Sequence, residues 1–302
     1  MTNAVGGIAN ISLVTTSSGL SNHVSEDASS CLENHRHYLQ ELLKSRTEEA
    51  DLQYWISECV YMSGLYWALH SAVLTGNTDL FDRPKTIAFV LLCERDDGGF
   101  APNVLLDSHI LHTMSALQIL ILCQAEEVID RRKISHYIAS LQQDDGSFAG
   151  DVYGEIDARF SYCAIASCCL LGIAGAVNCE KLASYILTCH NSDGGFGMRT
   201  GAESHAGQTF CCVAVLSLCG KLNTLDTSML RLWLSSRFLE KGGVNGRPEK
   251  KADVCYAWWV LATLNILNAL DCVNQSMVRD FVLRNQSVTG GISAHIGEEP
   301  VC

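Results

Sequence analysis

The sequence has few positive charges, no Cys-x-x-Cys pair and no apolar run long enough to cross a bilayer. Its 21 Lys and Arg are outnumbered by 33 Asp and Glu, which gives a formal net charge of −12. That charge argues against nucleic acid or an anionic membrane surface as the main partner. The missing Cys-x-x-Cys pair argues against a zinc ribbon or a thioredoxin-type site. The longest apolar run, near 164–177, is too short for a membrane span.

Other signals are missing as well. The N-terminus lacks a basic segment followed by an apolar core, so no signal peptide is predicted. No GxGxxG, Walker or Ser/His/Asp signature occurs. Cysteine, in contrast, is abundant: the 15 cysteines of this 302-residue chain lie mostly in apolar helical runs. They are therefore predicted to be small core residues in a reducing compartment, and we expect a cytoplasmic protein.

One structural unit repeats along the chain with a period of 48 residues. Glycine turns recur at that spacing, and so do Asp or Asn residues that suit a helix N-cap. The turns begin at Gly98, Gly146, Gly194, Gly242 and Gly290, and the caps are Asp82, Asp130, Asn178, Asp226 and Asn274. An amphipathic helix follows each cap. Helices that are apolar nearly all round are predicted over 54–75, 109–123, 157–171, 205–219 and 253–268.

This alternation predicts the fold class. A helix that is polar on one face lies outside, and one that is apolar all round is buried, so each unit pairs an outer helix with an inner one. The inner helices are more apolar than an open solenoid needs, which favours an all-α fold closed into an α/α toroid. Only ten residues follow Gly290-Gly291-Ile292, so the last inner helix is expected to be missing.

The chain is expected to form one folded domain. Residues 1–30 are rich in Ser, Thr, Asn and Gly and are predicted to be disordered. A first helix is expected over 33–46. The toroid domain is assigned to 31–302, incomplete at its C-terminal end.

Asp253 and Cys255 are the strongest candidates for chemistry. They lie two residues apart where a glycine turn and a basic cluster lead into an apolar helix, in the stretch GGVNGRPEKKADVCYAWW (242–259). A carboxylate and a thiolate, with one imidazole from elsewhere, form a plausible zinc-binding set with a fourth position open. The same residues also fit an ordinary helix N-terminus with an Asp cap and a buried Cys. The residues alone leave both interpretations open.

Unusual residues also mark the starts of the inner helices. Arg159, His205 and Asp253 stand where apolar segments begin, and in a ring they would converge at one mouth. Together with Arg247, Lys250 and Tyr256 they would form a pocket for a diphosphate. The inner helices also carry aromatic residues that suit either a core or an apolar funnel: Trp67, Phe160, Tyr162, Trp258 and Trp259. His109 and His112 could bind a metal, but a hydrogen-bonded pair of core histidines is the simpler interpretation.

Three long segments resemble the β subunit of Rab geranylgeranyltransferase, the type II protein prenyltransferase. They read LQQDDGSFAGDVYGEIDARFSYCAIA (141–166), NSDGGFGMRTGAESHAGQTFCC (191–212) and GGVNGRPEKKADVCYAWWVLA (242–262). The resemblance runs from about Tyr54 to Gly291 and implies an α6–α6 barrel. A triterpene cyclase, another toroid, would need an Asp-rich acid motif that this sequence does not contain.

The resemblance also implies roles for single residues. Asp253 and Cys255 match two zinc ligands. His205, Arg247, Lys250 and Tyr256 match diphosphate-binding positions, while Arg159, Trp67, Tyr162 and Trp259 match positions in the pocket. Ser63 matches a small residue that leaves room for a twenty-carbon isoprenoid. The family's third zinc ligand is a His on a sixth inner helix, which this sequence does not reach. Tyr162 and His112 depart from the family pattern, because a Phe and another aromatic are expected there.

The implied activity is transfer of a geranylgeranyl group from geranylgeranyl diphosphate to C-terminal cysteines of Rab GTPases. The acceptor cysteine would bind zinc as a thiolate, with Asp253, Cys255 and Tyr256 at the catalytic centre, and magnesium is a second candidate ion. The implied partners are an α subunit, a Rab escort protein and the Rab proteins. The alternative is a truncated, non-catalytic chain that binds only the α subunit or the isoprenoid.

Overall fold

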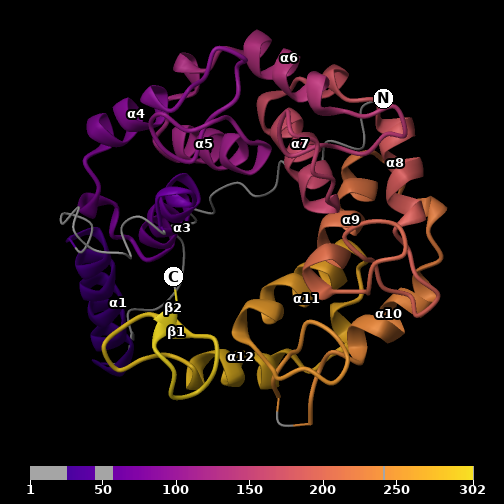
Figure 1. The fold of residues 1–302 in the computed structure, drawn as a ribbon. Coiled ribbons are helices and arrows are strands. Elements are labelled where there is room, and N and C mark those ends of the chain that lie inside the picture. Colours follow the sequence, from indigo (N-terminus) through magenta and orange to yellow (C-terminus); the bar gives the residue numbers. More distant parts are fainter. Residues whose placement is uncertain (1–25, 45–56, 241, 302) are drawn as a thin grey trace, which may run out of the picture.

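Pairs of helices are arranged in a ring in the computed structural model, which describes residues 26–44, 57–240 and 242–301 (Figure 1). The inner helices of this part of the chain are α3 (Tyr61–Leu74), α5 (Ile110–Leu122), α7 (Ala158–Leu171), α9 (Ala206–Leu218) and α11 (Val254–Ile266). The outer helices are α1 (Glu26–Lys44), α4 (Arg83–Leu92), α6 (Arg131–Leu141), α8 (Cys179–Thr188), α10 (Thr227–Ser235) and α12 (Gln275–Arg284). The predicted α/α toroid is confirmed.

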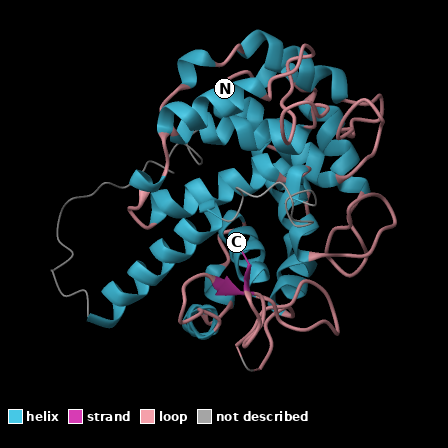
Figure 2. Cartoon of the chain, turned by 60° about the vertical axis from the view of Figure 1, so that its left-hand side comes forward, coloured by secondary structure: helices cyan, strands magenta, loops and turns pink. Residues whose placement is uncertain are grey.

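Short elements complete the repeat. A 3-10 turn follows each inner helix: η2 (Thr78–Leu80), η3 (Glu126–Val128), η4 (Ala174–Ala176), η5 (Leu222–Thr224) and η6 (Leu270–Cys272). Two antiparallel strands of two residues each, β1 (Ile292–Ser293) and β2 (Pro300–Val301), follow α12. In the turned view of Figure 2, many of the longer loops project from one side of the ring.

The helix boundaries follow the capping signals in the sequence. All five predicted N-cap side chains accept a backbone N–H from the first turn of their outer helix, which satisfies a donor that the helix cannot. Helix α1 begins earlier than predicted, at Glu26 instead of near residue 33. Of the predicted disordered segment 1–30, residues 1–25 lie outside the described residues and 26–30 belong to α1. Serine residues lowered the apparent helical signal there, although serine is well tolerated near a helix N-terminus.

Successive repeats are joined by one hydrogen bond near the N-terminus of each inner helix. The backbone N–H donates to a carbonyl 40 residues further along the chain, in the loop of the next repeat. The bonds are Met62–Pro102 and Ile110–Gly150 at 2.9 Å, Ala158–Met198 and Ala206–Gly246 at 2.8 Å, and Val254–Ala294 at 3.3 Å. The first amides of a helix have no hydrogen-bond acceptor within the helix. Each inner helix therefore obtains an acceptor from the loop of the next repeat.

Each glycine turn packs against the next outer helix. The five turn glycines have φ between 86° and 94°, a conformation that favours glycine. A Cβ on Gly98, Gly146 or Gly194 would collide with the backbone of α6, α8 or α10. In the four turns where the following residue is also glycine, a Cβ on it would meet an aromatic ring of the same outer helix, for example Tyr137 at Gly99.

Helix α1 takes the place of a sixth outer helix. A Cβ on Gly290 would collide with the backbone of Asn34, and one on Gly291 would meet the ring of Tyr38. This is the same pair of contacts that the earlier turns make with their outer helices. Tyr38 also donates to the Pro300 carbonyl at 3.2 Å, and the Gly291 amide donates to His35 Nδ1 at 3.0 Å. The two ends of the described chain therefore close the outer ring together, which the sequence periodicity did not predict.

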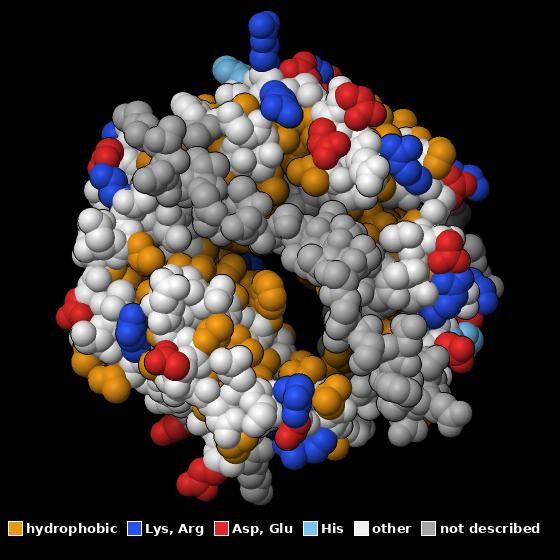
Figure 3. Space-filling view, turned by 180° about the vertical axis from the view of Figure 1, so that it is seen from behind, with side chains coloured by type: hydrophobic (Ala, Val, Ile, Leu, Met, Phe, Trp, Pro, Cys, Tyr) orange, Lys and Arg blue, Asp and Glu red, His pale blue; other side chains and the backbone are white. Residues whose placement is uncertain are grey.

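The inner ring has a gap. Consecutive inner helices pack against each other from α3 to α11, but α3 and α11 share no comparable contact among the described residues. Figure 3 shows an opening through the ring with hydrophobic side chains along part of its rim. The sixth inner helix of the expected α6–α6 barrel is not among the described residues. The core lies between the two rings, where side chains such as Phe148, Phe196 and Leu182 are fully buried.

Replacing Gly290 by Ala tests the closure by α1. Gly297 is the matched control, because it also has positive φ (84°) but has no atom near the position of a Cβ. Gly297→Ala should reduce the free energy of unfolding by about 1 kcal/mol through backbone strain alone. Gly290→Ala should reduce the free energy of unfolding by roughly 1–3 kcal/mol more than this, because its Cβ would collide with α1. Denaturant unfolding of both variants measures the difference, and equal losses would contradict the role of α1.

Candidate functional site

Polar side chains cap the inner helices at one end of the ring. His109, Asp157, His205 and Asp253 are the N-caps of α5, α7, α9 and α11, and each accepts the N–H two residues further on. These four caps share one register of the 48-residue repeat. Asp157, two residues before Arg159, holds the repeat position of His205 and Asp253, and its carboxylate accepts the Arg159 amide at 2.8 Å.

His205 and Tyr256 join α9 to α11 across this mouth. His205 Nε2 lies 3.1 Å from the Tyr256 hydroxyl oxygen, and the Gly207 amide donates to His205 Nδ1 at 3.2 Å. Because Nδ1 accepts that capping bond, the proton of the neutral ring is on Nε2, which donates to Tyr256. The Tyr256 O–H is then free to donate to a ligand. Burial, followed by the charge of Arg247, lowers the pKa of His205 and so favours this neutral form.

Two predicted cations at the mouth are held by carboxylates. Arg159 Nη2 donates to Asp157 Oδ2 at 2.8 Å, and the Asp157 side chain is completely buried. Arg247 forms an ion pair with Glu203, which is exposed to solvent. Both arginines are close enough to His205 to lower its pKa, so the structure brings these three predicted residues together. The Lys250 side chain is exposed on the same turn, where its backbone N–H donates to the Arg247 carbonyl at 3.4 Å.

Asp253 and Cys255 face each other at the start of α11. The Cys255 amide donates to Asp253 Oδ1 at 2.9 Å. Burial, and next the Asp253 carboxylate, raises the pKa of the Cys255 thiol to about 12. A bound cation would stabilise the Cys255 thiolate that burial and the Asp253 carboxylate disfavour. This donor chemistry fits two positions of a zinc site.

A third metal donor is not found in the part of the chain that the structure describes. No group of three His, Cys, Asp or Glu side chains there is arranged to hold a metal ion. His295 comes near this end of α11, because the adjacent Ala294 carbonyl accepts the Val254 amide. Its Nδ1 instead lies 3.6 Å from Glu298 Oε2. The pair alone is fewer than the three protein ligands of a typical catalytic zinc site.

Aromatic rings line the inner wall. Phe210 stands between Tyr162 and Trp259, with ring centroids 5.3 and 5.2 Å away. Phe210 was missed in the sequence, although it stands one repeat after Tyr162 in the same register. Trp67 is 51% exposed. Burial raises the pKa of the Tyr162 hydroxyl, which keeps it protonated.

Ser63 belongs to a small polar cluster on the same wall. Its hydroxyl lies 3.3 Å from His112 Nδ1 and 3.2 Å from the Ser115 hydroxyl. Burial, reinforced by the charge of His109, lowers the pKa of His112 to about 4. The two histidine rings lie 5.7 Å apart. His112 is therefore a neutral, hydrogen-bonded core residue.

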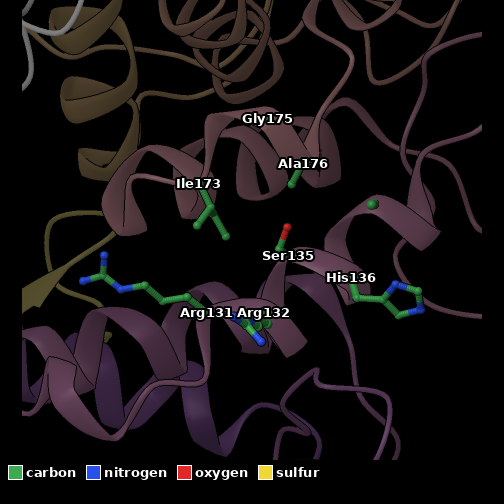
Figure 4. Close-up of a pocket in the computed structure, with 8 residues that line it drawn as sticks. Arg131, Arg132, Ser135, His136, Ile173, Gly175 and Ala176 are labelled. Carbon is green, nitrogen blue, oxygen red and sulfur yellow. The ribbon is translucent and has the colours of Figure 1, made fainter.

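A pocket among the described residues lies away from this mouth. It has a volume of 540 Å³ and is lined by α6 and the η4 turn, including Arg131, Arg132, Ser135 and His136 (Figure 4). None of the predicted site residues borders it. The candidate site is thus defined by converging side chains at the mouth of the ring.

Comparison with known proteins assigns the class. Residues 31–301 match the family described as the prenyltransferase alpha-alpha toroid domain, and the chain belongs to that family. Segments of the chain are similar to type-2 geranylgeranyl transferase β subunits. A probable subunit from Dictyostelium discoideum is 42% identical over 84 residues, which is 28% of this chain and 25% of that protein. The Saccharomyces cerevisiae subunit is 39% identical over 89 residues, 29% and 26% of the two chains.

The alignments thus span about a quarter of the length of these curated relatives. Among solved structures, the protein geranylgeranyltransferase-I of Candida albicans, complexed with GGPP, matches with a TM-score of 0.78 and 22% identity. The match covers 89% of this chain and 86% of the Candida albicans chain. A type II terpene cyclase from Scytonema matches with a TM-score of 0.59 and 14% identity, covering 87% and 81%. At identities this low, the two matches show a shared fold and nothing more. None of the described helices has the length and apolarity that crossing a membrane requires.

The low pKa of His112 predicts a pH dependence of stability. An unfolded histidine binds a proton near pH 6.5, whereas folded His112 does so only near pH 4. The unfolded state therefore binds more protons between these values, and the stability present above pH 6.5 is lost as the pH falls toward 4. Each pKa unit corresponds to about 1.4 kcal/mol, so the loss reaches up to about 3 kcal/mol.

Denaturant unfolding at pH 7.5, 6 and 5 measures this loss. His112→Gln should flatten the dependence, with a residual slope from the other buried histidines. His136→Gln, at an exposed position, is the control for the replacement of a histidine by glutamine. An unaltered slope in His112→Gln would show that His112 is not the titrating group.

Proposed function

We propose that this chain is a catalytic β subunit that transfers a geranylgeranyl group from geranylgeranyl diphosphate to C-terminal cysteines of Rab GTPases. The observation that carries the proposal is the His205–Tyr256 pair between two arginines and the Asp253–Cys255 pair. This arrangement places hydrogen-bond donors for a diphosphate directly beside side chains that could bind a metal ion. The named relatives, type-2 β subunits, support the same activity.

The mouth suits a diphosphate leaving group. Tyr256 offers its O–H, while Arg247 and Lys250 offer positive charge. Charge-assisted hydrogen bonds of this kind stabilise the negative charge that develops as the diphosphate departs. Because the protein has a net charge of −12, such a ligand needs this local cluster. In the proposed bound state, Arg247 exchanges its exposed partner Glu203 for phosphate oxygens.

The inner wall suits the isoprenoid. Tyr162 and Trp259, which pack on either side of the buried Phe210, are proposed to form an aromatic surface on which an apolar chain loses contact with water. Arg159, fixed by buried Asp157, is proposed to line the pocket between this wall and the diphosphate. Ser63 is proposed to leave space for the far end of a twenty-carbon chain, and Trp67 to border it.

We also propose that Asp253 and Cys255 bind zinc, with a third protein ligand from outside the described residues. When bound, zinc favours the thiolate form of an acceptor cysteine at neutral pH. Within this chain, Asp253 also caps α11, which fixes its carboxylate next to Cys255. Magnesium, as a partner of the diphosphate, is a second proposed ion.

The proposed partners follow from the named relatives. A β subunit implies an α subunit, and the type-2 class implies Rab GTPases presented by an escort protein, in the cytoplasm. A second function is a non-catalytic chain that binds only the α subunit or the isoprenoid. This alternative is favoured because Asp253 and Cys255 have no third metal ligand beside them in the described part of the chain.

Binding measurements test the diphosphate assignment. Arg247→Ala and Lys250→Ala should each weaken binding of geranylgeranyl diphosphate by about 1.5–3 kcal/mol, the value of a hydrogen bond to a charged group. Binding of geranylgeraniol, which has no phosphate, should remain nearly unchanged. Arg132→Ala, on the outer face, is the control and should affect neither ligand. Equal losses for the diphosphate and the alcohol would contradict the assignment.

Zinc content tests the metal assignment and separates the two functions. The full chain, co-expressed with an α subunit, should contain zinc by mass spectrometry, and Cys255→Ala should lose most of it. Cys272→Ala, at an exposed position in η6, should retain it. Transfer to a Rab–escort complex should follow the zinc content. Zinc that persists undiminished in Cys255→Ala would remove the proposed ligand, and zinc without transfer would support the non-catalytic alternative.

A further inference from the structure

Three cysteines meet where α7 ends, α8 begins and α9 ends. Cys179 is the first residue of α8, Cys219 is the C-cap of α9, and Cys169 lies in the last turn of α7. All three are free thiols. Helix α9 has 13 residues and is therefore about 20 Å long, so this cluster lies far from His205 at the other end of the helix. It plays no part in the proposed prenyl transfer.

Within the cluster, Cys179 and Cys219 are the paired thiols. Their side chains are hydrogen-bonded to each other, whereas burial and then the charge of Cys179 raise the pKa of Cys169. An ion pair between the neighbouring residues Lys221 and Glu180, 2.6 Å long, holds the two segments together. Both Cys179 and Cys219 are half-buried, so a small oxidant can reach them.

The surroundings activate one sulfur of the pair. The hydrogen bond from Cys219, the largest effect, lowers the pKa of the Cys179 thiol and outweighs burial and the charge of Glu180, while Lys221 lowers this pKa further. The same hydrogen bond raises the pKa of Cys219. Cys179 also lies in the first turn of a helix, where the helix dipole favours an anion. The pair therefore favours a nucleophilic thiolate at Cys179 next to a protonated thiol at Cys219.

We propose that Cys179 and Cys219 are a redox modification site that forms a reversible disulfide under hydrogen peroxide. The Cys179 thiolate attacks one peroxide oxygen, the O–O bond breaks, and hydroxide leaves and takes up a proton to become water. The Cys219 sulfur then attacks the sulfenic sulfur of Cys179, the S–O bond breaks, and a second water leaves with the proton of Cys219. Two thiols lose two electrons, and one peroxide is reduced to two waters. The product links the start of α8 to the end of α9.

Peptide mapping of the full chain tests this site. The reduced protein is treated with a slight excess of hydrogen peroxide at pH 7, the remaining thiols are blocked with N-ethylmaleimide under denaturing conditions, and the digest is analysed without reductant. The dominant product should be a peptide pair joined through Cys179 and Cys219 that dithiothreitol separates. Cys272→Ser should give the same pair at the same rate. A dominant Cys169–Cys179 link, or Cys179 oxidised beyond sulfenic acid without any link, would overturn the proposal.

Alkylation provides a second measurement that needs no disulfide. Removing the hydrogen bond in Cys219→Ala should raise the pKa of Cys179 and reduce its thiolate fraction at pH 7. The higher intrinsic nucleophilicity of a more basic thiolate compensates in part. Iodoacetamide should therefore label Cys179 about fivefold more slowly in Cys219→Ala than in the unchanged chain. An equal rate in both proteins would show that Cys219 does not activate Cys179.

Discussion

The first amides of each inner helix need a hydrogen-bond acceptor, and the next repeat supplies one. The chain provides this carbonyl 40 residues further on, and it does so five times from Met62 to Val254. Because a buried N–H without a partner is costly, this bond fixes how far each repeat is turned against the next. It also points all inner helix N-termini toward the same mouth. The side chains that cap those termini, among them His205 and Asp253, are brought together as a consequence.

The closure of the outer ring depends on residues from opposite ends of the described chain. Gly290 and Gly291 pack on Asn34 and Tyr38 of α1, as earlier glycine turns pack on their own outer helices. A repeat protein with open ends would leave such a turn exposed. Here the N-terminal helix covers it. Among the described residues, no inner helix lies between α11 and α3.

The sequence predicted the local part of this structure well. Helix caps, glycine turns and inner helices follow from a few residues each, and their 48-residue spacing locates most boundaries to within two residues. The role of α1 was not predicted, because its sequence does not share the period visibly and its partner turn is more than 250 residues away. A contact of that kind leaves no local signal.

Only part of the candidate site was predicted, because contacts between residues far apart in the sequence leave no local signal. The His205, Arg247 and Tyr256 group follows from the basic cluster and the family resemblance, and the structure brings these residues together. Asp157 and Phe210 were missed, although both repeat in register with recognised residues. Glu203 was missed because nothing in the sequence pairs it with Arg247. Residues that hold another side chain in place lack a motif of their own.

The structure of this chain with geranylgeranyl diphosphate bound would test the central claim most directly. The account predicts phosphate oxygens within hydrogen-bonding distance of the Tyr256 hydroxyl and the Arg247 guanidinium. It also predicts the isoprenoid chain against Phe210 and Trp259. A diphosphate bound in the outer pocket beside Arg132, or an isoprenoid outside the lumen, would contradict it.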